Sequence, residues 1–245
     1  MIGPLISRPE DVASALEHDP VAFAAQADAM LEGADPLTVL GWAGRAFGKS
    51  LAVTAAMGDT VLAHLASRAV PGVDLLFVDT GYHFAETIGT VDAVRASYPV
   101  RMLTITPKRS KEAHEADYGT LYGTDPDACC AIRKVAPLDN ALRGYRAWAT
   151  GLRRDESAAR AGTPTVSWDD KRELLKLAPI AGWLDRDVDR YLGEHPDVVL
   201  NPLLQQGYRS IGCAPCTRPV TPGEDARAGR WAGRAKTECG LHYQI

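Results

Sequence analysis

After about residue 50, short apolar segments alternate with segments of helical length, and this alternation limits the fold more than any other feature of the sequence. Three apolar segments are expected to be strands, at residues 50–56, 74–79 and 100–106. Residues 59–69 and 84–97, which lie between them, are expected to be helices. Such alternation forms right-handed crossovers, which make the strands parallel and place helices on both faces. The sequence therefore predicts an α/β fold with a mainly parallel, twisted sheet flanked by helices.

The rest of the chain extends this sheet and adds a part at each end. Residues 146–151 and 173–180 are further strand candidates, separated by a polar segment that contains arginines, and residues 184–194 are expected to be a helix. One sheet of about five or six strands follows. Residues 1–47 are rich in alanine, and their two Asp-Pro pairs predict helix starts with an aspartate cap. We divide the chain into a helical segment packed on the core (1–47), an α/β domain (48–216) and a C-terminal tail without helical or strand periodicity (217–245).

The charge balance and hydropathy exclude some classes of function. The chain has 245 residues, with 27 Lys and Arg against 31 Asp and Glu, and a net charge of −4. This balance argues against a protein that coats nucleic acid. No segment approaches the roughly 18 consecutive apolar residues that a membrane helix needs, and the first ten residues do not resemble a signal peptide. We expect a soluble, cytoplasmic protein with no nucleic-acid or membrane partner; the oligomeric state stays open, a homo-oligomer included.

Polar residues follow the expected strands at the edge of the sheet where open α/β folds gather ligands. The candidates are Thr54 and Gly58 after the first strand, Asp79, Thr80 and Gly81 after the second, and Gly151, Arg153, Arg154 and Arg160 after a later one. Three guanidinium groups on one loop can bind the oxygens of phosphate or sulfate in a forked geometry. The alternatives are an ordinary turn after the first strand and a solvated loop with local Arg–Asp pairs.

The five cysteines fall into two pairs and a single residue. Cys129 and Cys130 are adjacent, Cys213 and Cys216 form a C-x-x-C motif, and Cys239 lies near the end of the chain. An odd count in a chain of this size argues against a secreted disulfide framework. Adjacent cysteines are strained disulfide partners, so buried free thiols or metal ligands remain.

Four thiolates suit either a structural zinc ion or an iron–sulfur cluster. Zinc usually takes cysteines spaced so that one turn directs both sulfurs at a small ion, whereas adjacent cysteines point apart. We therefore favour a [4Fe–4S] cluster over zinc. A thioredoxin-type redox pair at the C-x-x-C motif is the third interpretation, although such a pair would follow a strand near the start of its fold.

Cys239 lies on a basic segment, with Lys236 and His242 close to it in the sequence. Such neighbours lower the pKa of a thiol and make it a nucleophile. The preceding Arg227 and Arg230 suit a segment that folds over an anionic substrate. The alternative is an inert, exposed cysteine.

Three motifs together resemble those of the assimilatory adenylyl-sulfate reductases. They are Cys-Cys-x-x-Arg-Lys at 129–134, Gly-Cys-x-Pro-Cys at 212–216 and Glu-Cys-Gly-Leu-His at 238–242. The likeness covers residues 40 to 245 and includes the Asp-Thr-Gly and Gly-x-Arg-Arg segments. It implies an adenine-nucleotide α-hydrolase-like fold, with a nucleotide-binding domain that carries the cluster site, a catalytic tail that is expected to be mobile, and a role in sulfate assimilation and cysteine biosynthesis.

The resemblance also implies roles for individual residues. Cys239 would be the nucleophile, with Lys134 and His242 as further catalytic residues, and Cys129, Cys130, Cys213 and Cys216 would bind the [4Fe–4S] cluster. The phosphosulfate would contact Arg153, Arg154, Arg160, Arg227 and Arg230. One departure concerns the turn after the first strand, because many relatives have a serine-rich turn where this chain keeps a single hydroxyl, Thr54.

The implied reaction is the reduction of adenosine 5′-phosphosulfate (APS) to sulfite and AMP through an S-sulfocysteine, with thioredoxin as the electron donor. Within the same family, a reductase of 3′-phosphoadenylyl sulfate (PAPS) is the alternative, although such enzymes usually lack the four cluster cysteines. A non-catalytic iron–sulfur or zinc protein that senses nucleotide is the alternative from another class. The placeable arginines are assigned to the phosphosulfate, so we expect APS to be preferred over PAPS.

Overall fold

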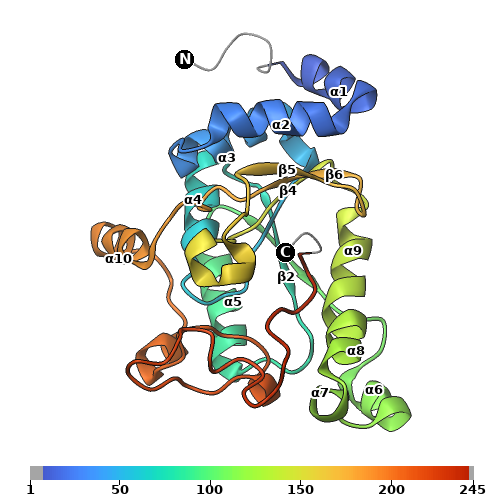
Figure 1. Ribbon diagram of the computed structural model, residues 1–245, viewed down its shortest axis with the longest axis vertical. Coiled ribbons are helices and arrows are strands. Elements are labelled where there is room, and N and C mark those ends of the chain that lie inside the picture. The colour runs from blue at the N-terminus through green and yellow to red at the C-terminus, as the bar shows by residue number, and fades with distance from the viewer. Residues whose placement is uncertain (1–7, 243–245) are drawn as a thin grey trace.

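A six-stranded sheet with the order β3-β2-β1-β4-β6-β5 forms the centre of the protein in the computed structural model, which describes residues 8–242 (Figure 1). Neighbouring strands are parallel except for β5 and β6. The predicted fold class is therefore confirmed. The strands are β1 (Leu51–Thr54), β2 (Asp74–Val78), β3 (Arg101–Ile105), β4 (Ala147–Ala149), β5 (Val166–Asp169) and β6 (Leu174–Leu177).

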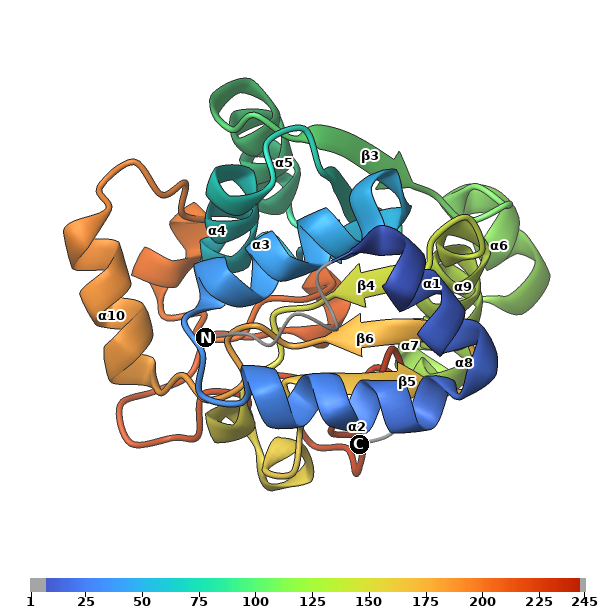
Figure 2. The same ribbon diagram turned by 90° about the horizontal axis from the view of Figure 1, so that it is seen from above.

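The sequence prediction misses β5, which lies in the polar segment between the last two strand candidates. This four-residue strand pairs antiparallel with β6 at the edge of the sheet. Helix α2 lies across it (Figure 2), and the Val166 N–H donates to the Asp28 carboxylate at 2.8 Å. A short edge strand with two polar residues lacks the apolar run that marks a buried parallel strand.

Three helices precede the sheet, and proline stands in the first turn of each. The predicted caps are confirmed, because Asp19 accepts the Ala22 N–H at 2.9 Å and Asp35 accepts the Thr38 N–H at 3.1 Å. Side chains of these helices share one apolar core with the sheet. The three helices are α1 (Pro9–His18), α2 (Pro20–Leu31) and α3 (Pro36–Phe47).

The two faces of the sheet are covered by different helices. Val53 and Phe77 face the larger core, to which α3 and α4 contribute, whereas Ala52, Leu76 and Trp148 face α9 in a second cluster. Because successive residues of β1 and β2 face opposite covered sides, the centres of both strands are apolar on both sides. The helices after β1 are α4 (Val61–Ala69), α5 (Ala85–Ser97), α6 (Lys111–Tyr118), α7 (Leu121–Thr124), α8 (Pro126–Cys130), α9 (Ala136–Leu142) and α10 (Asp185–Glu194).

The helical segment that carries the adjacent cysteines contains a π-helical turn, Ala131–Val135, between α8 and α9. Pro137 follows it and has no N–H to donate to the preceding turn. A π turn accommodates this loss, and such turns are frequent at functional sites.

Beyond α10 the chain runs past the carboxyl ends of the strands. Two short 3₁₀ turns, Pro202–Gln206 and Ala214–Cys216, lead into the tail, which folds back beneath the sheet (Figure 1, red). In the described part of the tail, residues 217–242, turns replace helices and strands. Among residues 8–242, none of the helices is long and apolar enough to cross a bilayer.

Candidate active site

The strand order reverses at β1, because β2 and β4 lie on opposite sides of it. At such a point the carboxyl ends of parallel strands leave a crevice for a ligand. A cavity of about 530 Å³ opens there, lined by residues 54–60 after β1, residues 150–153 after β4, and part of the tail. Its volume is in the range of sites for drug-sized molecules.

The loop after β1 is held in a strained conformation. Met57 and Thr60 have φ values of 58° and 51°, in the left-handed region that residues other than glycine rarely adopt. Asn201 is completely buried; its side-chain amide donates to the Met57 carbonyl at 2.9 Å, and its backbone N–H donates to the Gly58 carbonyl at 3.0 Å. These bonds fix the loop at the cavity wall, and sequence reasoning missed Asn201 because nothing in its local sequence marks it.

The adjacent arginines of the loop after β4 point to different partners. Arg153 lines the cavity, and Arg154 does not. Arg154 makes a bidentate ion pair with Glu32 of α2 at 2.6 and 2.8 Å, and it donates to the Thr163 carbonyl at 2.7 Å. The structure thus places Arg154 in a contact between the N-terminal helices and the loop, rather than in the predicted phosphosulfate contact.

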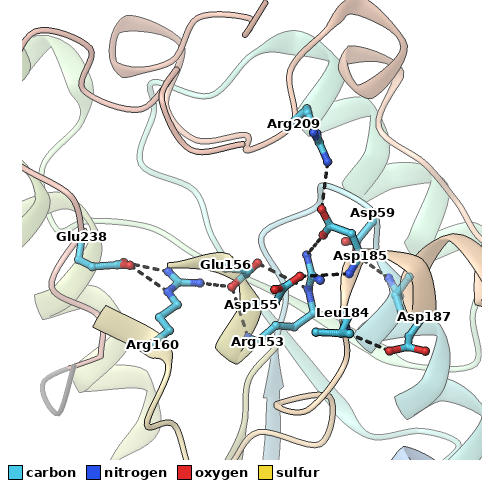
Figure 3. Close-up of polar contacts among 11 residues, drawn as sticks. Asp59, Arg153, Asp155, Glu156, Arg160, Leu184, Asp185, Asp187, Arg209 and Glu238 are labelled. Carbon is cyan, nitrogen blue, oxygen red and sulfur yellow. Dashed lines mark hydrogen bonds and ion pairs between the residues drawn. The ribbon is translucent and has the colours of Figure 1, made fainter. Parts of the chain in front are cut away.

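A chain of alternating charges runs along the cavity (Figure 3). Arg160 is 7% exposed and makes a bidentate pair with Glu238 at 2.9 and 2.8 Å, and it also contacts Glu156. Arg153 donates to Asp185 at 2.9 Å. Arg209 donates to the other oxygen of Asp185 at 3.0 Å.

Cys239 reaches the cavity from the tail, next to Glu238. Burial raises the pKa of the Cys239 thiol, but Lys134, the Leu241 N–H and Arg230 lower it, and the net result is a pKa below the usual value. A larger thiolate fraction at neutral pH is what a nucleophilic cysteine needs.

His242 is stacked on Trp148, with ring centroids 5.4 Å apart and an angle of 14° between the planes. Burial, together with nearby Lys176 and Arg160, holds the pKa of His242 well below its usual value, so the imidazole is neutral near pH 7. The Trp148 indole N–H donates to the Thr54 hydroxyl at 2.8 Å. The Thr54 hydroxyl at the end of β1 therefore contacts the ring on which His242 is stacked.

A second, smaller pocket adjoins the cavity and brings the two cysteine pairs together. It is lined by Cys129 and Cys130 from α8, by Cys213 and Cys216 from the 3₁₀ turn, and by Cys239. Four residues line both spaces, namely Lys134, Arg230, Trp231 and Cys239. Gly212 permits this arrangement, because a Cβ there would lie 2.3 Å from the Arg230 guanidinium.

The chemistry of this pocket fits an iron–sulfur group. Its described lining offers the free thiols of the two cysteine pairs together with that of Cys239, and it includes neither a carboxylate nor an imidazole. The Thr80 hydroxyl lies 3.2 Å from the Cys213 sulfur, and a hydrogen bond to a ligand sulfur tunes the properties of such groups. Within residues 8–242, no three or more Cys, His, Asp or Glu side chains are arranged to hold a single metal ion.

The structure gathers most of the predicted site residues and leaves some apart. Asp79 and Gly81 lie outside both linings, and Thr80 belongs to the cysteine pocket rather than to the cavity. The cavity lining contains Thr54, Gly58, Gly151, Arg153, Arg160, Arg227, Arg230, Lys134, Cys239 and His242. Besides Asn201, sequence reasoning missed the cavity residues Asp59, Asp185, Arg209 and Glu238. Of these, only Glu238 had a signal, as the neighbour of Cys239.

The family of phosphoadenosine phosphosulfate reductase domains matches residues 50–219, and the chain belongs to this family. A Streptomyces coelicolor protein named adenosine 5′-phosphosulfate reductase is 60% identical over 222 residues, which cover 90% of this chain and 94% of the relative. A Rhodococcus opacus protein of the same name is 49% identical over 243 residues, covering 95% and 98%. The resemblance drawn from the cysteine motifs is thus confirmed.

Solved structures agree with this family. The phosphoadenylyl-sulfate reductase of Candida auris, solved as a phosphate complex, is 30% identical with a TM-score of 0.69 and covers 79% of this chain and 95% of its own. The Candida glabrata FMN adenylyltransferase, with 12% identity and a TM-score of 0.53 over 85% of this chain and 71% of its own, shares the fold alone. Both likenesses are consistent with the predicted adenine-nucleotide α-hydrolase-like fold.

Proposed function

We propose that this protein reduces adenosine 5′-phosphosulfate to sulfite and AMP, as an oxidoreductase of sulfate assimilation that supplies cysteine biosynthesis. The observation that carries the proposal is the position of Cys239 in the lining of the cavity of about 530 Å³, where Lys134 and Arg230 help to lower the pKa of its thiol. The names of the curated relatives support APS as the substrate.

In the first step, the Cys239 thiolate attacks the sulfur of APS. A bond forms between Cys239 Sγ and the sulfate sulfur, and the bond from that sulfur to the bridging oxygen breaks. AMP leaves with this oxygen and its electron pair, and the enzyme retains an S-sulfocysteine. Two anions must approach each other, and Lys134, Arg160, Arg227 and Arg230 line the cavity where they can neutralise the charge of the transition state.

In the second step, a thiolate of reduced thioredoxin attacks Cys239 Sγ and sulfite leaves with the electron pair of the broken S–S bond. The second thiol of thioredoxin then resolves the mixed disulfide, which restores Cys239 and yields oxidised thioredoxin. The sulfur of the substrate is reduced by two electrons and the dithiol is oxidised by two. His242, which is neutral, can accept a hydrogen bond at one ring nitrogen and donate one from the other beside the tail.

Cys129, Cys130, Cys213 and Cys216 would hold a [4Fe–4S] cluster. Bound there, it would cross-link α8 to the 3₁₀ turn and set the electrostatic potential near Lys134. Lys134 would then lie between cluster and substrate, since it lines both the cysteine pocket and the cavity. Burial and the neighbouring Cys213 and Cys216 raise the pKa of Cys129 to about 11, so this thiol needs a metal to become a thiolate.

The decisive experiment mixes the purified protein with APS in the absence of any reductant. Mass spectrometry is expected to find one added SO₃ group on Cys239 and one AMP released per chain. Cys239→Ser is expected to form no adduct while keeping its fold and its iron. An adduct on another cysteine, or turnover by the serine variant, would exclude this function for Cys239.

A further inference from the structure

The loop after β1 has a conformation that its own residues disfavour. Met57 and Thr60 both lie in the left-handed region, and Thr60 is β-branched, so its backbone angle is a genuine outlier. Such residues persist only where the surrounding structure imposes the conformation, and they cluster at ligand sites. Every residue from 54 to 60 lines the cavity. Whatever imposes the shape of this loop therefore also shapes the cavity.

Asn201 holds the first part of the loop, and contacts outside the loop fix its orientation. Its side-chain carbonyl accepts the Leu203 N–H at 3.0 Å, and its amide nitrogen donates to the Thr87 hydroxyl at 3.1 Å. These two bonds determine which end of the amide faces Met57. The remaining amide hydrogen is thus directed at the Met57 carbonyl, where it makes the bond of 2.9 Å.

Tyr98 holds the second part of the loop through Thr60. The Thr60 hydroxyl donates to the Val199 carbonyl at 2.6 Å, so its oxygen accepts from the Tyr98 hydroxyl at 3.1 Å. The Tyr98 oxygen in turn accepts the Val199 N–H at 2.7 Å. Tyr98 and Thr60 are both buried, and water does not compete for these bonds.

The groups that hold the loop lie behind it and not in the cavity. Val199 and Asn201 belong to one short segment between α10 and the following 3₁₀ turn, and Tyr98 follows α5. None of the three lines the cavity. They can therefore affect a nucleotide only through the loop. A loop that is ordered before its ligand arrives does not have to be ordered on binding, which raises affinity.

We propose that Asn201 and Tyr98 are positioning residues for the nucleotide, because they hold the strained loop after β1 in its binding shape before the ligand arrives. The inference rests on the proposed function, since it takes the nucleotide part of APS as the ligand of this loop. Cys239 belongs to the tail. The two residues therefore determine nucleotide affinity and leave the reactivity of the Cys239 thiol unchanged.

The first test compares Asn201→Ser with Thr87→Val in the holoenzyme. Serine can still accept the Leu203 N–H, but it is too short to reach the Met57 carbonyl. Thr87→Val is the matched control, because it removes a buried partner of the same amide and leaves the bond to Met57. In Asn201→Ser, Kd for 5′-AMP and KM for APS are expected to rise about 10-fold, with kcat nearly unchanged. In Thr87→Val, all three should stay close to the wild-type values.

Tyr98→Phe gives an independent route that keeps the packed ring. It removes the hydroxyl that links Val199 to Thr60, and Kd for 5′-AMP is expected to rise about fivefold. Tyr191→Phe is its control, because the Tyr191 hydroxyl lies 2.8 Å from His64 and does not touch the loop. Unchanged affinity in both Asn201→Ser and Tyr98→Phe would overturn the inference. Equal losses in the two controls would also overturn it, because the effect would then come from lower stability in general.

Two further measurements locate the effect and separate it from the proposed function. Without nucleotide, iodoacetamide should alkylate Cys239 at the same rate in Asn201→Ser as in the wild type. A large change in that rate would place the effect on the tail and contradict the inference. If the wild type binds 5′-AMP and the variants bind it equally well, only the inference fails. If the wild type does not bind 5′-AMP at all, the proposed function itself fails.

Discussion

The two walls of the cavity are built by different kinds of interaction. The sheet wall consists of loops that leave β1 and β4 directly, above strands whose residues are almost completely buried. The tail wall has neither helix nor strand in residues 217–242, and ion pairs hold much of it, including Arg160 with Glu238 and Lys236 with Asp127. Apolar burial fixes the wall formed by the loops after β1 and β4, whereas charge fixes the segment that carries Cys239.

This difference suggests that the two walls have different roles in the reaction. In the proposed reaction a thioredoxin active site has to reach the S-sulfocysteine after AMP has left, so the tail would have to separate from the sheet without unfolding it. Ion pairs at a cavity wall suit this requirement, because an incoming anion competes directly for the same arginines. If the two walls are held independently, a change in one wall should leave the structure of the other intact.

The largest effect is expected from Cys213→Ser, which removes one ligand where the tail joins the sheet. Serine oxygen is a poor substitute for a soft thiolate, so the variant should lose nearly all bound iron and its activity. Iron and sulfide analysis, with the visible absorption spectrum, measures this loss. Cys239→Ser is the matched control and should keep the iron. Full iron and activity in Cys213→Ser would contradict the placement of the cluster at this site.

The second effect concerns Glu238→Gln, which breaks the buried pair with Arg160. Loss of one partner of a fully buried pair costs about 3–5 kcal/mol. Arg160 keeps its contact with Glu156, so the cost here should be smaller, and the tail should open more often. We expect Cys239 to react with iodoacetamide about 100-fold faster, measured by mass spectrometry, while hydrogen exchange in β1 stays slow. Glu224→Gln, in an exposed tail pair with Arg218, should change the rate little.

A lower pH should open the tail, as Glu238→Gln is expected to do. Burial raises the pKa of Glu238, but Arg160 and Arg227 lower it, and the net pKa is below the usual value. The pair therefore stabilises the closed tail at neutral pH, and this stabilisation is lost as the pH falls through the lowered pKa. A tail that stays closed in the variant and in acid would contradict the contrast between the two walls.

The third effect is a shift in the pH dependence of the rate at which Cys239 is alkylated. Burial and Glu238 raise the pKa of this thiol, but Lys134, the Leu241 N–H and Arg230 lower it further. Because the thiolate is the reactive form, alkylation should rise with pH and level off above the lowered pKa. Lys134→Gln should move the midpoint up by roughly one unit and slow alkylation about 10-fold at neutral pH.

Iodoacetamide is uncharged, so this measurement does not depend on the contact of Lys134 with substrate. Lys236→Gln is the control, because Lys236 pairs with Asp127 and lies over the Trp231 ring. If both lysine variants shift the midpoint equally, the positive potential that lowers the pKa of Cys239 does not come specifically from Lys134.

The sequence predicts the sheet wall well because apolar periodicity is a local signal. It locates five strands, although it places the ends of β1 and β4 two residues too far along the chain. The spacing of the cysteines indicates the second pocket. Asn201 and Asp185 carry no local signal, since their roles depend on residues far away in the chain. The same limit applies to Arg153 and Arg154, because the sequence does not show which of two adjacent arginines faces a ligand. In the structure Arg153 lines the cavity and Arg154 binds Glu32.

The smallest effect is expected on the sheet wall, from Glu32→Gln. This change weakens the bidentate pair that holds Arg154 and with it the loop that carries Arg153 and Arg160. The Glu32 and Arg154 side chains are 46% and 30% exposed, so the pair contributes about 1 kcal/mol at most. We expect KM for APS to rise about threefold to fivefold with kcat nearly unchanged.

Arg153→Gln and Arg154→Gln complete this test. If Arg154 acts only through the loop, Arg154→Gln should resemble Glu32→Gln, and the double variant should be no worse than either single one. Arg153→Gln removes a guanidinium from the cavity itself and should have the larger effect. A loss of kcat in Arg154→Gln that Glu32→Gln does not share would instead place Arg154 on the substrate, and the loop would have to turn on binding for Arg154 to leave Glu32.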